Sequence, residues 1–147
     1  RGLRGKRLAF GAAISMSSTV APTLMLAQAG VQLGDLAGHA QLDRHERVAL
    51  SVLHGDFDAG GLRLDIARQY LPRGLKIIAT SQPLPPHIIA CSANFPSDLE
   101  TRARTALLNP DELGLRAFEA LGESTRFVTI DDSHYHSVRR MLRTLGK

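Results

Sequence analysis

The sequence of 147 residues lacks several features that mark particular classes of protein. It contains one cysteine, Cys91, which excludes an intrachain disulfide and a zinc site built only from cysteines. It has no tryptophan, few other aromatic residues and no run of about 18 apolar residues that could cross a membrane. The composition, with 44% hydrophobic and 22% charged residues, is typical of a globular protein. The length suits one ordinary domain.

The charge is mildly basic, with a net value of +4 and an isoelectric point near 9.8. Basic side chains gather at the two ends of the chain: Arg1, Arg4, Lys6 and Arg7 at the start, and Arg139, Arg140, Arg143 and Lys147 at the end. Because no aromatic residues alternate with them, we interpret these groups as solvated termini and predict no nucleic-acid partner. The sequence begins at Arg1 with no charged-then-apolar leader before the first predicted strand, so we expect a mature product or a fragment.

Hydrophobic periodicity predicts strands that alternate with helices along the chain. The predicted strands are 6–10, 39–42, 75–80, 87–91 and 127–130, and the predicted helices are 18–29, 44–54, 62–71, 97–108, 111–121 and 133–145. Asp43, Ser97 and Pro110-Asp111 are expected helix caps. The proline-rich stretch 82–86 predicts a stiff extended connector. This alternation predicts an α/β layered fold with a largely parallel sheet.

The turn from Gly11 to Thr19 joins the first strand to the first helix and is rich in small and hydroxyl residues. Unpaired amides at a helix start suit an anion, and Ser15, Ser17, Ser18 and Thr19 could add hydroxyl donors. The alternative is that one of these residues simply caps the helix. The turn lacks the Gly-Lys-Ser/Thr ending of a Walker loop and the Gly-x-Gly-x-x-Gly pattern of dinucleotide sites.

Two further positions are candidates for ligand contact. His45, followed by Glu46, opens the second predicted helix, where an imidazole could face an anion, although a plain surface helix start is the alternative. Asp58 lies at a predicted strand end, where α/β sheets place their ligand crevice, and a simple turn aspartate is the alternative.

We predict no catalytic or metal centre and no cofactor. His134 and His136 would point to different sides of a helix, so Asp131 or Asp132 is better interpreted as a helix cap than as a metal ligand. No Gly-x-Ser-x-Gly elbow is present. Cys91 falls in an apolar strand pattern, which predicts a buried, unreactive thiol.

Taken in order, several segments resemble phosphate/phosphonate-type periplasmic solute-binding proteins of ABC importers. The matching segments are Gly2 to Gly11, Ser15-Met16-Ser17-Ser18 with Pro22, His45-Glu46, Val52 to Gly60, Tyr70 to Thr80 with Pro83, Pro85 and Pro86, and Phe127 to Tyr135. The segment Ser15-Met16-Ser17-Ser18 stands where the family usually has Ser-Thr-Ser-Gly. The segment Val52 to Gly60 resembles the family's Asn-Gly-x-x-Asp-Ala stretch. Together they cover nearly the whole chain.

The resemblance implies a type II periplasmic-binding fold of two α/β lobes. Residues 1–84 would form the second, anion-gripping lobe as a three-layer α/β/α unit. Residues 85–147 would form a hinge strand and helices returning to an incomplete first lobe. Ser15, Met16 through its amide, and Ser17 would hold the oxyanion, while His45 and Asp58 would contact a protonated or amino-bearing part of the ligand. The implied ligand is a phosphonate, phosphate or phosphite, the implied partner an ABC permease, and the implied location the periplasm.

Two departures from the family pattern shape further expectations. Met16 replaces the usual threonine, which removes one hydroxyl donor, and the family's first half has no counterpart in this chain. We therefore expect the returning segment to expose an apolar patch or to pair with another chain, as in a homo-oligomer. A ligand-sensing regulatory domain of the same fold and a truncated remnant that binds nothing are the alternative functions.

Overall fold

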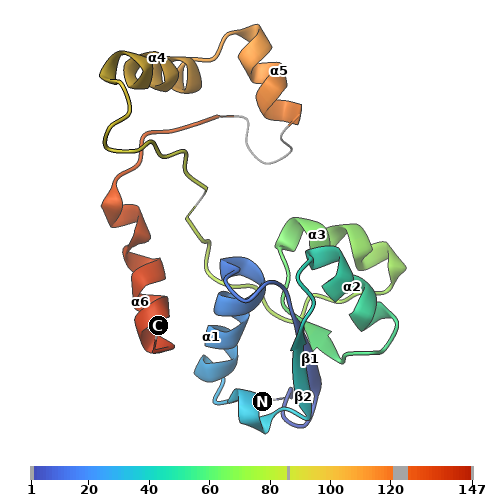
Figure 1. Ribbon diagram of the computed structural model, residues 1–147. Helices are drawn as coiled ribbons and strands as arrows, with labels where there is room; N and C mark the ends of the chain where they lie inside the picture. The colour runs from blue at the N-terminus through green and yellow to red at the C-terminus, as the bar shows by residue number, and fades with distance from the viewer. Residues whose placement is uncertain (1, 86, 121–125, 147) are drawn as a thin grey trace. The chain divides into compact units, whose positions relative to one another are not determined.

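The computed structural model describes residues 2–85, 87–120 and 126–146 (Figure 1). The chain divides into two compact units. The first comprises residues 1–85 with 135–147, and the second comprises residues 86–134. Within the described residues, every helix is too short or too polar to span a membrane.

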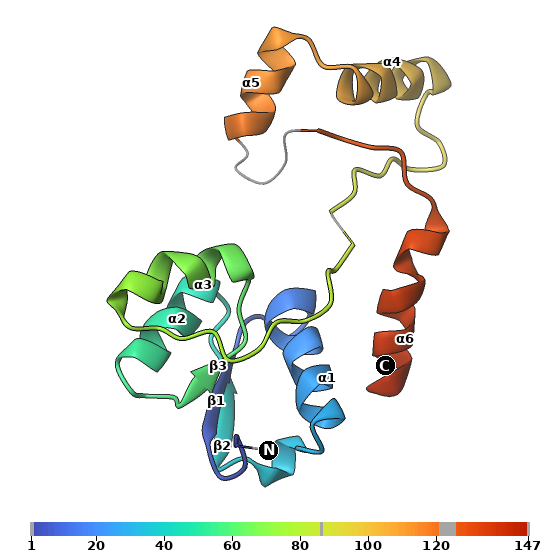
Figure 2. The same ribbon diagram turned by 180° about the vertical axis from the view of Figure 1, so that it is seen from behind.

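The first unit is built on a parallel sheet of three short strands. They are β1 (Arg7–Phe10), β2 (Gly38–Gln41) and β3 (Ala59–Gly60), and their order in the sheet is β2-β1-β3. Leu8 in the central strand pairs with His39 on one side and with Ala59 on the other. Figure 2 shows β1 running between its two neighbours. The α/β fold with a parallel sheet, predicted from the alternation of elements, is confirmed.

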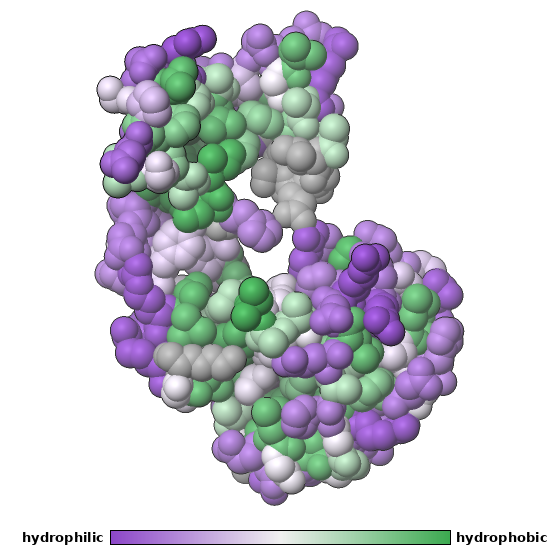
Figure 3. Space-filling model, in the orientation of Figure 1, coloured by the Kyte–Doolittle hydropathy of each residue, from purple (hydrophilic) through white to green (hydrophobic). Residues whose placement is uncertain are grey.

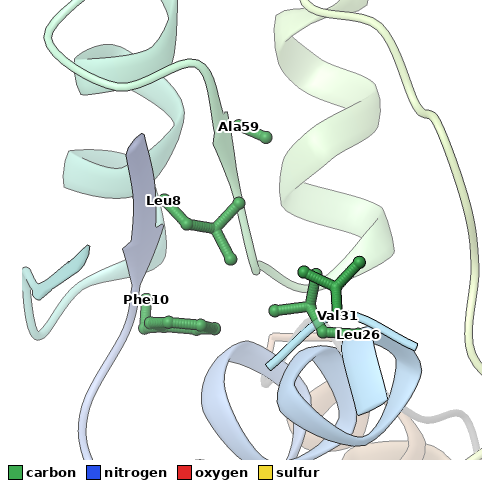
Figure 4. Packing of buried hydrophobic residues seen from close by; sticks show 5 residues of the cluster. All are labelled: Leu8, Phe10, Leu26, Val31 and Ala59. Atoms are coloured by element: carbon green, nitrogen blue, oxygen red, sulfur yellow. The ribbon is translucent and has the colours of Figure 1, made fainter. Parts of the chain in front are cut away.

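Helices cover both faces of this sheet, which makes the first unit three-layered. A π-helical turn, η1 (Met16–Val20), leads into α1 (Ala21–Gln28), which is followed by the 3-10 turn η2 (Leu33–Asp35). On this side Leu8 and Phe10 point toward Leu26 and Val31 (Figure 4).

The opposite face of the sheet is covered by α2 (His45–Leu53), which also contacts α3 (Leu64–Tyr70), and α3 continues into the 3-10 turn η3 (Leu71–Arg73). A Cβ on Gly60 would collide with the Val48 side chain and lie 3.2 Å from that of Val52, so glycine permits this close approach of α2 to β3.

The end of α1 lies close to the predicted bound of 29, and Gly30 follows its cap residue Ala29. Gly30 has φ +74°, a left-handed conformation that glycine adopts without a Cβ penalty. Its amide donates to the carbonyl of Ala27 at 2.9 Å, and the Val31 amide donates to that of Leu26 at 2.9 Å. This pair of bonds is the Schellman arrangement, which satisfies carbonyls at the helix end and places Val31 in the core.

The predicted caps are only partly right. Asp43 does not cap α2, because Arg44 occupies the cap position and Asp43 itself has a left-handed φ of 62°. Ser97 is the first residue of its helix, and Pro96 precedes it as the cap. The Asp111 carboxylate, by contrast, accepts a hydrogen bond of 2.8 Å from a backbone amide in the first turn of the next helix, so this prediction is confirmed.

The second unit contains α4 (Ser97–Leu108) and α5 (Glu112–Ala120), both close to their predicted bounds. Leu121, the predicted last residue of the second of these helices, lies outside the described residues. Phe118 is buried and packs edge-on against Phe127, with ring centroids 5.0 Å apart. The chain then returns to the first unit through η4 (Asp132–Tyr135) and α6 (His136–Thr144), which contacts α1.

Three predicted strands are wrong. Residues 75–80, 87–91 and 127–130 join no sheet in the described chain, although the stretch 82–85 lacks regular structure as predicted. A strand needs a neighbour that takes up its backbone hydrogen bonds, and β-branched residues favour a strand only in that setting. As a consequence Cys91 is exposed, and the prediction that its thiol is buried is also wrong.

Candidate functional site

Three segments meet where the parallel strands of the first unit end. They are residues 11–18 after β1, 42–45 after β2 and 61–63 after β3. The Leu42 amide donates to the Phe10 carbonyl at 2.8 Å, and a Cβ on Gly61 would lie 2.6 Å from the Ser18 carbonyl oxygen. This carboxyl edge is where open α/β sheets bind their ligands.

The helix start at this edge presents both amides and hydroxyls. Ser15 is the cap residue, and its Oγ accepts a hydrogen bond of 3.3 Å from the Ser18 amide. The next two amides, those of Met16 and Ser17, are the first of the helix and have no intrahelical acceptor. The Ser15 and Ser17 hydroxyls lie 3.5 Å apart. Ser15 thus caps the helix, as the alternative interpretation of this turn predicts. The amides of Met16 and Ser17 still face outward from the helix end.

The first turn is wider than an α-helix. The carbonyl of Ser15 accepts from both the Thr19 amide at 3.1 Å and the Val20 amide at 3.0 Å. The second of these bonds spans five residues, which is the π-helical pattern that often occurs at functional sites.

Buried contacts fix this turn against the sheet. The Thr19 hydroxyl donates to the Ala12 carbonyl at 2.9 Å. A Cβ on Gly11 would overlap the Ser18 side chain, lying 2.6 Å from its Cβ. Ser18 is 1% exposed, and its Oγ has no hydrogen-bond partner in the described part of the chain. Ser18 and Thr19, which the sequence suggested as possible anion donors, are therefore buried in the support of the turn.

His45 stands at the same edge as the first residue of α2. Its Nδ1 accepts a hydrogen bond of 3.2 Å from the Arg63 amide, so a neutral ring carries its proton on Nε2. Partial burial lowers the pKa of His45 below its ordinary value of 6.5, and the positive charge of Arg63 acts in the same direction. The imidazole is therefore a neutral donor at pH 7.

Asp58 lies at the other edge of the sheet. It directly precedes β3, and its carboxylate accepts a hydrogen bond of 2.7 Å from the amide of Arg7, the first residue of β1. This bond lowers the pKa of Asp58, and the nearby Arg7 guanidinium, 3.7 Å away, adds to the effect. The structure therefore does not bring Asp58 together with Ser15, Ser17 and His45, and its expected place at the carboxyl edge is wrong.

Arg63 also lies at this edge, although it was not among the predicted site residues. Its side chain is half-buried and forms a forked ion pair with Asp65, with Nε 3.0 Å and Nη2 2.5 Å from the two carboxylate oxygens. Its backbone holds His45, as described above. The signal available from sequence was its position, because it is the first charged residue after β3.

The acidic and histidine-rich stretch near the end of the chain behaves as a helix cap. The Asp131 carboxylate accepts a hydrogen bond of 2.8 Å from the Ser133 amide, which confirms the predicted cap. Among residues 2–85, 87–120 and 126–146, no three side chains of the metal-binding types come together.

Comparison with known proteins agrees with this architecture. Residues 1–135 match the family of ABC transporter, phosphonate, periplasmic substrate-binding proteins. The structure is similar to that of PhnD1 from Prochlorococcus marinus (MIT 9301) in complex with methylphosphonate, with a TM-score of 0.73 and 22% sequence identity. The match covers 99% of this chain and 59% of the PhnD1 chain, so the present chain spans well under two thirds of that protein.

The family match extends over most of the sequence and includes the helix start, His45 and the whole three-stranded sheet. The structural similarity to PhnD1 supports the fold independently of the match to the family's sequence pattern. This chain therefore belongs to the phosphonate family of periplasmic substrate-binding proteins of ABC transporters.

Proposed function

We propose that this chain binds a phosphonate-type oxyanion at the helix start formed by Ser15, Met16 and Ser17, and that it serves as all or part of the substrate-binding component of an ABC importer. The observation that carries the proposal is the helix start itself. Two amides without intrahelical acceptors and two hydroxyls 3.5 Å apart lie at the carboxyl edge of a parallel sheet. Such a group of donors, together with the positive end of a helix dipole, suits an anion.

The chemistry of the donors favours a tetrahedral oxyanion such as a phosphonate, phosphate or phosphite. The Ser15 Oγ already accepts the Ser18 amide, so its own proton is directed toward a ligand or toward Ser17. Met16 contributes its amide alone, because a methionine side chain has no hydroxyl. The methylphosphonate in the similar PhnD1 structure supports this ligand class.

His45 would supply a further donor through its Nε2 proton. Because the Arg63 amide occupies Nδ1, the neutral ring can present only a donor at its other nitrogen. Because the ring is uncharged, it can donate a hydrogen bond to a phosphonate oxygen without requiring one particular ionisation state of the ligand. Asp58 is not part of the proposed site, since it lies at the opposite edge of the sheet and is held by Arg7.

The family gives the setting of this binding reaction. We propose a periplasmic location and an ABC permease as the protein partner. Within the chain, residues 1–84 would act as the anion-gripping lobe, and residues 85–147 would belong to the hinge and to the first lobe. The share of PhnD1 that the chain covers agrees with a binding cleft whose second wall requires additional polypeptide.

A thermal-shift titration with phosphate, phosphite, methylphosphonate, 2-aminoethylphosphonate and sulfate tests the proposal. Ligand that binds only the folded state adds about 2.7 kcal/mol at a hundredfold excess over Kd. We expect a shift selective for phosphorus oxyanions. In Ser15→Ala/Ser17→Ala the affinity should fall about tenfold to hundredfold for each lost bond to a charged oxygen.

Ser97→Ala is the matched control, because it makes the same chemical change at the exposed first residue of α4. It should leave the titration unchanged. Absence of a shift with every anion, or an equal loss of affinity in the control, would contradict binding at the helix start.

A further inference from the structure

Arg63 links the start of α3 to His45 at the proposed oxyanion site. It precedes α3 as the cap residue, and its amide donates to the His45 Nδ1 at 3.2 Å across 18 residues of sequence. Hydrophilic side chains cover much of the surface of the first unit, where α2 and α3 lie (Figure 3). Arg63 differs from a solvated surface charge, because it is partly buried and its backbone reaches a residue of the proposed site.

The Arg63 side chain is held by Asp65, two residues along the chain. Its Nε and Nη2 lie 3.0 and 2.5 Å from the two carboxylate oxygens, and this forked geometry fixes the plane of the guanidinium. The hydrogen bonds from Arg63 lower the pKa of Asp65, and amides in the first turn of α3 add to the effect. The carboxylate is therefore ionised at neutral pH, and it anchors Arg63 to the start of α3.

The Arg63 amide restricts the His45 ring to one role. A ring nitrogen that accepts a hydrogen bond carries no proton, so the neutral ring carries its proton on Nε2. A protonated ring would turn a second donor toward the Arg63 N–H, and two donors cannot bond to each other. Partial burial and the Arg63 charge also lower the pKa of His45, more than the charges of Glu46 and Asp65 raise it. With this bond in place, His45 presents a donor at Nε2.

We propose that Arg63 is a positioning residue for oxyanion binding. Its amide, anchored through the ion pair with Asp65, holds His45 in the tautomer and orientation that offer the Nε2 proton to the ligand. This positioning role rests on the proposed function and adds to it a residue that acts through His45. All the contacts that support it lie within the first unit, at the starts of α2 and α3.

Two substitutions at residue 63 separate the amide from the side chain. Arg63→Ala keeps the amide and removes the guanidinium, whereas Arg63→Pro removes both. Proline suits this backbone, because the φ of Arg63 is −64°. Both variants lack the charge, so the difference between them measures the hydrogen bond to His45. Leu64→Pro is the matched control, because it places the proline at the first position of α3, where a missing amide costs little.

The first measurement needs no ligand, because the ¹⁵N shifts of the imidazole show which nitrogen carries the proton. In the wild-type chain and in Leu64→Pro at about pH 7.5, we expect His45 Nδ1 to give the shift of an unprotonated nitrogen. In Arg63→Pro the shifts of the two ring nitrogens should move toward each other, and in Arg63→Ala the change should be smaller. A wild-type ring with its proton on Nδ1, or a folded Arg63→Pro protein with unchanged shifts, would overturn the positioning role.

The second measurement is the affinity for methylphosphonate. Arg63→Pro should bind about threefold to tenfold more weakly than Arg63→Ala, the size expected for one oriented hydrogen bond, and Leu64→Pro should bind as the wild-type chain does. If the wild-type chain binds and the two variants at residue 63 bind equally well, the positioning role is wrong and the oxyanion site stands. If the wild-type chain binds no anion, the proposed function fails and the positioning role fails with it.

Discussion

The sheet of the first unit and the extended segments that follow it use similar residues with opposite results. In β1, Leu8, Ala9 and Phe10 are at most 3% exposed, because strands on both sides and helices on both faces enclose them. In the segments 75–80 and 87–91, isoleucines of equal hydrophobicity remain exposed. The difference shows that an apolar strand sequence becomes a core only when neighbours along the hydrogen-bonding direction are available.

The largest expected effect is on the core of the first unit. Phe10→Ala removes a side chain that packs against Leu26 and Val31 and should lower the free energy of unfolding by about 3–5 kcal/mol. Leu113→Ala, at a leucine that is 76% exposed, should change it by less than about 0.5 kcal/mol. Urea denaturation followed by circular dichroism measures both, and equal effects would remove the contrast between enclosed and exposed apolar residues.

Amide hydrogen exchange should separate the same two regions. At low protein concentration, the β1 amides should exchange at least about 10³-fold more slowly than those of residues 76–80, since only the former open through global unfolding of a domain about 5 kcal/mol stable. Protection of residues 76–80 as strong as that of β1 would show that an intrachain partner covers them.

An intermediate effect is expected where the turn meets the sheet. Gly11→Ala places a Cβ against the buried Ser18 side chain and should lower the free energy of unfolding by about 1–3 kcal/mol. Gly34→Ala has open space around its Cβ and an ordinary φ, so it serves as the control and should have little effect. A Gly11→Ala protein as stable as the control would mean that Ser18 can move away at little energetic cost.

The smallest effect is the pH dependence at His45. Its lowered pKa means that the unfolded chain binds a proton at a higher pH than the folded protein does. Stability should therefore fall as the pH drops below about 6.5, and His45→Gln should reduce that slope. His54→Gln, at an exposed histidine just after the same helix, is the control. Thermal melts between pH 7.5 and 5 measure the slope, and no difference between the two variants would contradict the proposed environment of His45.

Local signals were sufficient for much of the first unit. The apolar run ending at Phe10, the small residues after it and Gly30 specify a strand, a turn and a helix stop through short-range chemistry. The helix start that holds Ser15 and Ser17 could be predicted for the same reason. Its π-helical form could not, because nothing in the sequence pattern signals the bond from the Val20 amide to the Ser15 carbonyl.

The misplaced features depend on partners distant in sequence. Asp58 was assigned to the wrong edge because a two-residue strand starting at Ala59 is too short to locate from periodicity. The segments 75–80 and 87–91 have strong strand propensity, yet propensity does not reveal whether a neighbouring strand exists. Arg63 was overlooked because its contact with His45 joins the start of α2 to the segment after β3, and only the folded sheet brings these two places together.

The most direct test of anion binding at the helix start is an NMR titration of the ¹⁵N-labelled chain with methylphosphonate. We expect the largest amide shifts at Met16 and Ser17, with smaller changes at His45, and we expect these shifts to disappear in Ser15→Ala/Ser17→Ala. Saturable shifts that leave Met16 and Ser17 unmoved, while amides elsewhere respond, would contradict the account.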